Sequence, residues 1–311
     1  MTPLAAHEIR GNWATLLLPV NADESIDYAL LDAELDHYIK SRVNGIYSNG
    51  SAGEFYTQTE DEFDKVNHAL AAKCEAAQMP FQVGASHMSP QISLERLKRA
   101  KALKPSAFQV ILPDWFVPTF PEIEKFLRKM AEVAAPVPLI VYNPPHAKRH
   151  LTPDEWQKVS EIPNIAGMKV PGGDVAWYEA MQPVFEKMSV FIPGHFLATG
   201  ISRGAHGAYS NVACLSPAGA QRWYELCTKD IAAALAFESK LVPFWNANVA
   251  PLITRDKLPN MAADKAAAAA GAWLPGFSPR LRWPYNSASP EAVANIAAQA
   301  KQQLPELMTG R

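Results

Sequence analysis

The chain has 311 residues, of which 48% are hydrophobic, and 29 basic residues nearly balance 31 acidic ones to give a formal net charge of −2. This length and composition can bury a large core and fit one large α/β domain or two smaller ones. The charge balance, with no long run of either sign, argues against a nucleic-acid-binding surface and against a disordered tail.

Eight short segments have the composition of buried β-strands. Several of them are apolar almost throughout, which is expected when helices cover both faces of a sheet. In chain order the segments are 13–19, 45–50, 81–86, 107–113, 138–144, 165–170, 189–194 and 205–211.

Helix-compatible segments separate these strands, at 26–41, 59–77, 92–103, 121–134, 152–160 and 174–187. Thr152 gives the clearest start signal, because Pro153 fits the first helical position and Glu155 completes a capping box. Asp174 is the expected cap of the helix that follows it. After about residue 215 the strand signals stop, and we expect helices at 217–240, 241–255, 259–271 and 290–308.

The alternation of strands and helices predicts a parallel sheet built from βα units. Eight such units favour a closed (β/α)8 TIM barrel. A Rossmann-type open sheet is the alternative, but LLLPVNADES follows the first strand where a GxGxxG motif would stand. We therefore expect a barrel domain at 1–235 and a C-terminal helical extension at 236–311. No Gly/Ser linker separates them, so both should form one cooperative unit.

Other sequence features bear on the location of the protein and on metal binding. The three cysteines are far apart without a CxxC pair, so we expect neither a disulfide framework nor a structural zinc site. The N-terminus lacks the features of a signal peptide, and the apolar run 266–270 is far shorter than the ~20 residues of a membrane span. We expect a cytoplasmic protein that binds neither membranes nor nucleic acid. The eight histidines form no HxH or HExxH motif, so we expect no metal site.

Polar residues at the strand ends are the candidates for chemistry, because TIM barrels place their active sites at the C-terminal ends of the strands and in the loops that follow. The candidates are Ser48, Asn49, Ser51, Glu54, Asp114, Trp115, Tyr142, Asn143, Lys169, His195, Tyr209, Ser210 and Asn211.

Lys169 ends the sixth strand segment, in IAGMKVPGGD. Desolvation at a barrel mouth disfavours the ammonium form, which lowers the lysine pKa and frees an amine that can attack a ketone. The resulting protonated Schiff base is an electron sink for breaking a bond beyond the adjacent carbon. A lysine at a strand end can equally extend along the surface with its amine in solvent, and position alone does not separate the two.

Tyr142 and the loop at 48–54 can each be interpreted as functional or as purely structural. Tyr142 is a candidate general acid or base, or a core tyrosine whose hydroxyl is satisfied. The loop SNGSAGE, residues 48–54, can direct backbone N–H groups and the Ser51 hydroxyl at a substrate carboxylate, although such loops are also ordinary turns. We expect Glu54 to anchor this loop through buried hydrogen bonds and not to act as an acid.

Together, four motifs resemble the dihydrodipicolinate synthase/N-acetylneuraminate lyase family of Schiff-base-forming class I aldolases. GIYSNGSAGEFYTQTEDEF resembles its carboxylate-binding loop, and VYNPP resembles its catalytic tyrosine motif. GMKVPGGD, which includes Asp174, is similar to its Schiff-base lysine motif, and GAHGAYSNVACLSP is similar to its eighth-strand segment. The order and spacing of the motifs agree over roughly residues 10–250.

The resemblance implies a TIM barrel with C-terminal helices, a homotetramer or homodimer, and no metal or organic cofactor. It implies that Lys169 forms an imine with a 2-oxo acid such as pyruvate or a 2-keto-3-deoxy sugar acid, and that Tyr142 moves protons. Ser51, Ala52 and Gly53 are then the carboxylate-binding residues. The remaining expected substrate contacts come from the last two strands: His195, Tyr209 and Ser210. For His195, a contact to the distal part of the substrate and a purely structural role are both open.

Three departures from the family pattern argue against a lysine-pathway synthase. Ala52 stands where a second hydroxyl residue is common, and Trp115 stands where the synthases supply a tyrosine to a neighbouring subunit. Ala147 replaces an arginine that binds a dicarboxylic partner. We therefore expect a Schiff-base lyase of the aldolase or dehydratase kind. A non-catalytic 2-oxo-acid-binding or regulatory protein is the alternative, and a metal-dependent aldolase has less support because clustered histidines are lacking.

Overall fold

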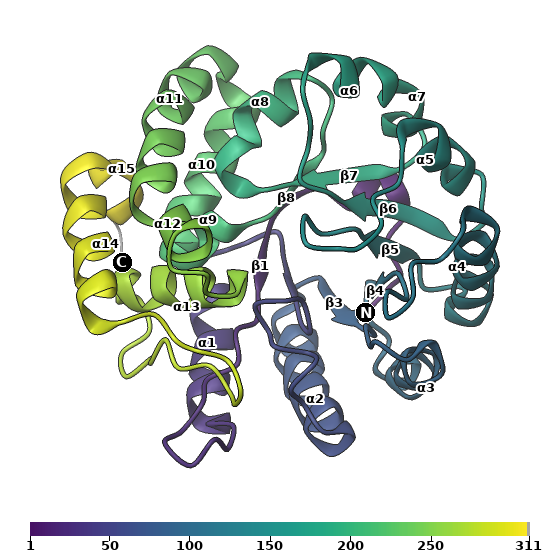
Figure 1. Cartoon of the computed structure of the whole chain (residues 1–311), viewed down its shortest axis with the longest axis horizontal. Helices are drawn as coiled ribbons and strands as arrows, with labels where there is room; N and C mark the ends of the chain where they lie inside the picture. The colour runs from purple at the N-terminus through teal and green to yellow at the C-terminus, as the bar shows by residue number, and fades with distance from the viewer. Residues whose placement is uncertain (310–311) are drawn as a thin grey trace.

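Eight parallel strands close into a barrel in sequence order (Figure 1). The structure, a computed structural model, describes residues 1–309. β1 pairs with both β2 and β8, which closes the sheet and confirms the predicted TIM barrel. The strands are β1 Gly11–Thr15, β2 Gly45–Tyr47, β3 Phe81–Gly84, β4 Ala107–Ile111, β5 Leu139–Tyr142, β6 Ile165–Lys169, β7 Ser189–Ile192 and β8 Gly207–Tyr209.

A ring of helices surrounds the strands (Figure 1). Between β1 and β8 these are α1 Tyr28–Lys40, α2 Glu60–Ala77, α3 Pro90–Ala100, α4 Phe120–Ala134, α5 Pro153–Ser160, α6 Val175–Ala180, α7 Gln182–Phe185 and α8 Leu197–Ser202. Short 3-10 turns are η1 Ala6–Glu8, η2 Lys101–Leu103 and η3 Gly194–Phe196. After β8 follow α9 Asn211–Leu215, α10 Pro217–Lys229, α11 Ile231–Asn248, α12 Ala250–Thr254, α13 Asn260–Gly271, α14 Pro290–Gln303 and α15 Pro305–Met308.

The predicted start signals of two helices are confirmed. The Thr152 hydroxyl accepts a hydrogen bond from the Glu155 N–H, and the Glu155 carboxylate accepts one from the Thr152 N–H, which completes the capping box. Asp174 caps α6 by accepting from the N–H of Trp177. The single helix expected at 174–187 is instead divided into α6 and α7. Pro183 lies at the start of α7 and has no N–H to continue the hydrogen-bond ladder of α6.

The first strand differs from its expected position. β1 begins at Gly11 and ends at Thr15, so the apolar LLLP that follows is a buried loop. Leu17 donates its N–H to the carboxylate of Glu34 on α1, at 2.8 Å, and not to a neighbouring strand. A side chain thus replaces the sheet as hydrogen-bond partner while the leucines stay buried. An apolar run in the sequence alone does not distinguish a buried strand from a buried loop.

The barrel interior is filled by large side chains. Trp13, Tyr47, Ile140, Phe191 and Tyr209 form one buried cluster inside the strands. A larger cluster lies between the strands and the surrounding helices. A barrel packed in this way is a core and not a pore, so space for a ligand is left only near the strand ends.

The C-terminal helices pack on one side of the barrel (Figure 1). α13 contacts α9, and α14 contacts both α13 and α11. The expected helix at 217–240 is divided at Asp230, whose side chain caps α11. The expected domain boundary at 235/236 falls inside α11, so a continuous helix connects the barrel to the extension.

Within residues 1–309, none of the helices combines the length and the apolar character needed to cross a bilayer.

Candidate active site

Lys169 and Tyr142 are register partners on the neighbouring strands β6 and β5. Side chains at one level of adjacent parallel strands point to the same face of the sheet. That face is the barrel interior, because the Lys169 amine also meets tyrosines from β2 and β8, elsewhere around the ring. The amine nitrogen Nζ lies 4.4 Å from the centroid of the Tyr142 ring. The strand register therefore brings the predicted amine and phenol together.

Three tyrosines surround the Lys169 amine. Its Nζ lies 5.3 Å from the ring centroid of Tyr47, 4.4 Å from that of Tyr142 and 5.5 Å from that of Tyr209. Nζ also donates to the Tyr47 hydroxyl at 3.4 Å. Aromatic faces favour a cation, but burial outweighs them and lowers the pKa of Lys169 to about 8. Roughly a tenth of the amine is then neutral at pH 7. The side chain as a whole is half-buried.

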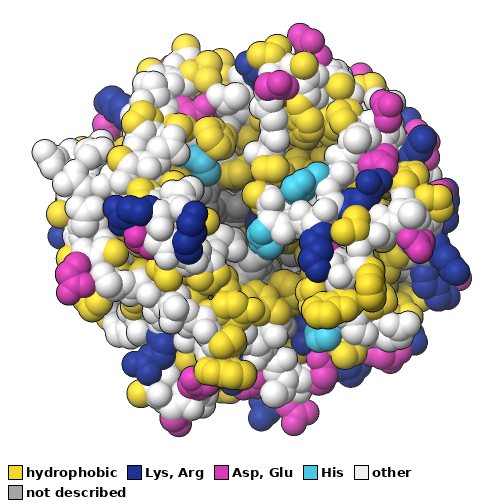
Figure 2. All heavy atoms as spheres, in the orientation of Figure 1, with side chains coloured by type: hydrophobic (Ala, Val, Ile, Leu, Met, Phe, Trp, Pro, Cys, Tyr) yellow, Lys and Arg dark blue, Asp and Glu magenta, His cyan; other side chains and the backbone are white. Residues whose placement is uncertain are grey.

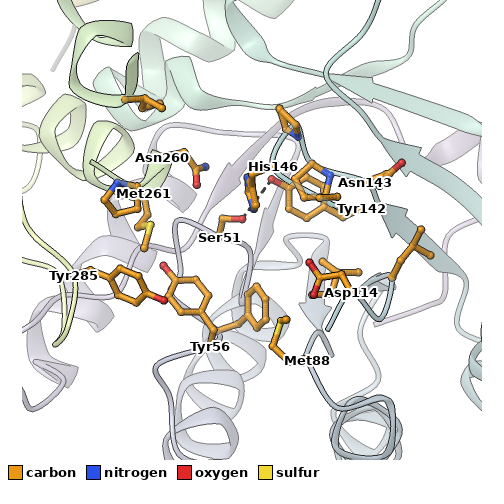
Figure 3. A pocket seen from close by; sticks show the side chains of 18 of the residues that line it. Ser51, Tyr56, Met88, Asp114, Tyr142, Asn143, His146, Asn260, Met261 and Tyr285 are labelled. Atoms are coloured by element: carbon orange, nitrogen blue, oxygen red, sulfur yellow. Dashed lines mark hydrogen bonds between the residues drawn. The ribbon is translucent and has the colours of Figure 1, made fainter. Parts of the chain in front are cut away.

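The Tyr142 hydroxyl faces Ser51 from the loop after β2, and the two oxygens lie 3.4 Å apart (Figure 3). Burial raises the pKa of Tyr142 to about 12, with the Ser51 hydrogen bond acting in the opposite direction. Tyr142 is therefore a phenol at neutral pH and is ready to donate its proton. The Ser51 hydroxyl can pass a proton on or return one, because a hydroxyl both donates and accepts.

Buried side-chain hydrogen bonds hold the loop at 48–54 in place. Ser48 donates to Asn67 at 2.6 Å, and Asn67 donates to Asn49 at 2.9 Å. Asn49 donates to Gln58, and Gln58 donates to the backbone oxygen of Gly53, each at 2.8 Å. All five residues are buried. The loop shape is thus set by the protein before any ligand binds.

The backbone of this loop leaves N–H groups free for a ligand. The N–H groups of Gly53 and Glu54 donate to the oxygens of Gly50 and Ser51, at 3.1 and 3.0 Å. Those of Ser51 and Ala52 donate to no acceptor among the described residues, although both residues are buried. Free N–H groups in such a turn form an anion-binding concavity. Gly53 shapes this turn, since a Cβ there would lie 2.9 Å from the backbone oxygen of Leu16.

Glu54 anchors the loop to the C-terminal extension, as the sequence predicts. It is fully buried and forms an ion pair with Lys265 of α13, which is also fully buried. Its second carboxylate oxygen accepts from the N–H of Arg282 at 3.1 Å. Both oxygens are occupied in this way, so Glu54 has no free position from which to act on a substrate.

The structure places Tyr209 and Ser210 in contacts with the protein itself. The Tyr209 hydroxyl donates to Gln82 at 2.5 Å, and its ring stacks on Phe191 with a centroid distance of 4.4 Å. Tyr209 therefore reaches the site through the face it presents to Lys169. The Ser210 hydroxyl caps α9 by accepting from the Ala213 N–H at 3.1 Å.

His195 lies in η3, after β7. Its Nδ1 accepts from the side-chain amide nitrogen of Asn211 at 2.8 Å, and its ring stacks on Trp245 with an interplanar angle of 8°. Burial lowers the pKa of His195 to about 4, so the ring is neutral at physiological pH. Neither His195 nor Tyr209 nor Ser210 lines the cavity next to Tyr142.

A cavity of about 810 Å³ opens beside Ser51 and Tyr142 (Figure 3). The loops after β2, β3, β4 and β5 form one side of it, and the segment from α12 to the start of α13, together with Tyr285, forms the other. Figure 2 shows this face of the molecule hollowed near its centre, with histidine side chains at the rim. The cavity therefore lies between the barrel and its C-terminal extension.

Two residues near the amine escaped the sequence analysis. Tyr47 occupies an inward position of β2, which strand alternation could have indicated. Asp264 lies one helical turn after Asn260, a residue of the cavity wall. Burial raises the pKa of Asp264 to about 6, while the positive charge of Lys169 acts in the opposite direction. In an alanine-rich helix remote in sequence, no local signal pointed to this carboxylate.

Across residues 1–309, no group of three or more His, Cys, Asp or Glu side chains is arranged to hold a metal ion. Cys74, Cys214 and Cys227 are free and buried.

Comparisons with known proteins show the family of the chain. The sequence model of the Dihydrodipicolinate synthetase family matches residues 8–303. The N-acetylneuraminate lyase of Rhizobium meliloti (strain 1021) is 29% identical over 203 residues, which cover 65% of this chain and 67% of the relative. The 4-hydroxy-tetrahydrodipicolinate synthase of Neisseria meningitidis serogroup B (strain ATCC BAA-335 / MC58) is 25% identical over 300 residues, which cover 94% and 98%.

A solved structure shows the same fold. The crystal structure of YagE, a prophage protein of the dihydrodipicolinic acid synthase family from E. coli K12 in complex with pyruvate, matches with a TM-score of 0.82 at 19% identity and covers 95% of this chain and 98% of that one. The family match extends over nearly the whole described chain, and the residues of the candidate site lie within the matched range. The chain belongs to the Dihydrodipicolinate synthetase family.

Proposed function

We propose that this protein is a Schiff-base-forming lyase of the class I aldolase or dehydratase kind, acting on a 2-oxo acid. One observation carries the proposal: a half-buried lysine amine whose pKa is lowered to about 8 lies against Tyr142, whose hydroxyl meets Ser51. Relatives named as a lyase and a synthase, and the pyruvate bound to YagE, support the reaction class and the 2-oxo acid.

The reaction begins at the neutral amine. Nζ of Lys169 attacks the ketone carbon of the 2-oxo acid, and the ketone oxygen leaves as water, which gives a protonated imine. The departing oxygen needs a proton, and the Tyr142 phenol is the group that can donate one. The phenolate left on Tyr142 is reprotonated through the Ser51 hydroxyl, 3.4 Å away, which donates its own proton and takes one up from water. The imine cation then accepts the electron pair of the bond that breaks.

The loop at 51–52 supplies the complementary charge site. The carboxylate of a 2-oxo acid is adjacent to the ketone, so it must bind close to the amine. The free N–H groups of Ser51 and Ala52, together with the Ser51 hydroxyl, form an anion site next to Tyr142. Ala52 contributes only its backbone, so one hydroxyl in this loop serves the reaction.

Borohydride trapping tests the proposal. The intact protein is incubated with pyruvate and borohydride, and the adduct is mapped by peptide mass spectrometry. We expect a reduced pyruvyl adduct on Lys169 and none in the folded Lys169→Met variant. Absence of an adduct on the folded wild-type protein would falsify the proposal. An adduct without turnover of any hydroxylated 2-oxo acid is the result expected for the binding-protein alternative.

We also propose that the protein forms a homo-oligomer through the loop after β4. Trp115, Phe116 and Val117 are 74%, 83% and 58% exposed in this loop. Three consecutive exposed apolar side chains are typical of a subunit contact. Analytical ultracentrifugation should show a dimer or tetramer, and Trp115→Ser together with Phe116→Ser should shift it towards the monomer. A wild-type monomer at micromolar concentration would contradict this proposal.

A further inference from the structure

We infer that the part of the substrate beyond the 2-oxo acid group is apolar, of aromatic size, and free of a second carboxylate. The inference rests on the proposed function, because it assigns a substrate class to that same site. It comes from the walls of the cavity beside Ser51 and Tyr142. Pyruvate itself has only three carbons, whereas a cavity of about 810 Å³ is in the size range of sites for much larger ligands.

Apolar side chains dominate the cavity wall. Phe55, Met88, Leu112, Ile253, Leu258 and Met261 line it from both the barrel side and the extension side. Side chains of this kind gain from burying an apolar arm and offer no hydrogen bonds to a polar one. Figure 3 shows Met88 and Met261 projecting into the space around Tyr56 and Tyr142. The wall therefore favours a ring or a branched alkyl group.

Three polar side chains of the wall are already engaged within the protein. The amide of Asn143 is already used, because its nitrogen donates to the Arg149 oxygen at 2.8 Å and its oxygen accepts from the Leu151 N–H at 3.0 Å. Ser51 and Tyr142 are engaged with each other and with the reaction. The other polar side chains of the wall are scattered among the apolar ones: Tyr56, Asp114, His146, Asn260 and Tyr285. A sugar-like arm would therefore bury many of its hydroxyls against apolar surface, which weakens binding.

Two buried polar atoms of the wall are left without a partner in the described chain. They are one carboxylate oxygen of Asp114 and the hydroxyl of Tyr56. Figure 3 shows the Asp114 carboxylate directed into the cavity below Tyr142. A single hydroxyl on an otherwise apolar arm can donate to Asp114. A carboxylate on the arm would face this negative charge.

No cation of the wall is available to hold a second carboxylate. Ala147 occupies the lining position where a cation would serve this purpose. Its two basic neighbours are held elsewhere: Lys148 donates to the Trp115 oxygen at 3.1 Å, and Arg149 forms an ion pair with Glu155. Burial lowers the pKa of His146 below its usual range, so this lining residue is neutral at neutral pH. A dicarboxylic 2-oxo acid therefore meets Asp114 with no cation among the side chains that line the cavity.

Competitive imine trapping tests the inference. The protein is titrated with pyruvate, 2-oxo-4-phenylbutanoate, 2-oxoglutarate and 2-keto-3-deoxygluconate, each with borohydride, and the concentration for half-maximal labelling of Lys169 is measured. We expect the phenyl compound to label at a concentration at least tenfold below that of pyruvate, and the other two to need more than the phenyl compound. Tighter labelling by 2-oxoglutarate or the sugar acid overturns the inference.

This readout separates the two proposals. Labelling by pyruvate without a preference for the phenyl compound leaves the Schiff-base function intact and rejects the substrate class alone. Absence of labelling by every compound rejects both. The readout does not depend on whether the enzyme cleaves or dehydrates its substrate, because imine formation precedes either reaction.

A charge introduced into the wall provides a gain-of-binding test. Ala147→Arg places a cation in the cavity, so we expect it to lower the half-maximal concentration of 2-oxoglutarate at least fivefold and to raise that of the phenyl compound. Lys148→Met is the matched control, because this lysine lies on Trp115 outside the lining, and it should change neither value. Unchanged labelling by 2-oxoglutarate in a folded Ala147→Arg variant contradicts the account of the wall.

Discussion

The Lys169 amine contacts the ring face of Tyr142, 4.4 Å from its centroid, while the Tyr142 hydroxyl is directed to Ser51. In the proposed reaction this side chain therefore has two separate functions. Its ring helps to exclude water from the amine, and its hydroxyl donates a proton. The arrangement follows from strand register, because β5 and β6 place the two residues at the same level of the barrel.

The pH dependence of the reaction should follow the deprotonation of the Lys169 amine. Imine formation needs neutral Lys169, and burial lowers its pKa to about 8. The neutral fraction rises as the pH passes upward through that value, so kcat/KM should increase about tenfold from pH 7 to its plateau and show an inflection near pH 8. Steady-state rates between pH 6 and pH 10 provide the measurement. A flat profile from pH 7 to pH 9 would contradict this role of the amine.

Asp264→Asn should move that inflection to lower pH. The negative charge of Asp264 raises the pKa of Lys169 and so opposes the effect of burial. Removing the charge leaves the ammonium less stabilised, which lowers the pKa further and frees the amine at lower pH. The rate of borohydride trapping as a function of pH measures the shift. Asp256→Asn is the control, because this exposed carboxylate pairs with Arg255 outside the site. An inflection that stays in place or moves upward would rule out the coupling.

Tyr142→Phe should lower kcat about 10²-fold or more, the usual effect of losing a positioned acid or base. The ring that shields the amine is retained, so pyruvate should still be trapped on Lys169, although more slowly. Tyr47→Phe is the matched comparison, since its hydroxyl also lies near the amine, at 3.4 Å, but has no Ser51 contact. Turnover that is unchanged in Tyr142→Phe, or reduced equally in both variants, would remove the proton-transfer assignment.

Glu54→Gln should destabilise the fold strongly. Glu54 and Lys265 are both fully buried, so the substitution leaves an ammonium group with no counter-charge. Breaking a buried pair in this way costs about 3–5 kcal/mol of unfolding free energy. Urea denaturation measures the loss. The double variant Glu54→Gln/Lys265→Met should recover part of it, because the unpaired charge is then gone. A double variant no more stable than Glu54→Gln alone would show that the ion pair is not the cause.

Local sequence signals predicted the fold and the proposed reacting pair. The eight strand segments, the capping box at Thr152 and the strand ends carrying Tyr142 and Lys169 could all be read from neighbouring residues. The break between α6 and α7 was not predicted, because the helical pattern of 174–187 continues across Pro183. Local pattern therefore predicts where an element lies better than where it is interrupted.

The unforeseen part of the site depends on tertiary packing. Asp264 and Met261 come from α13, more than ninety residues after Lys169 in the sequence, and reach the barrel mouth only because α13 packs on α9. The roles of Tyr209 and Ser210 depend on the contacts of their hydroxyls with Gln82 and the α9 backbone. Composition and spacing do not encode such contacts.

The reacting groups are carried by the strands, whereas a wall of the cavity belongs to the segment from α12 to Tyr285. Chimeras that exchange this segment with that of a relative could alter substrate choice while retaining the amine and phenol. The ion pair of Glu54 with Lys265 sets the condition for such an exchange. A donor segment without a lysine at the corresponding position would leave the carboxylate-binding loop attached to a buried, uncompensated anion. An exchanged segment should therefore keep a lysine at the position of Lys265.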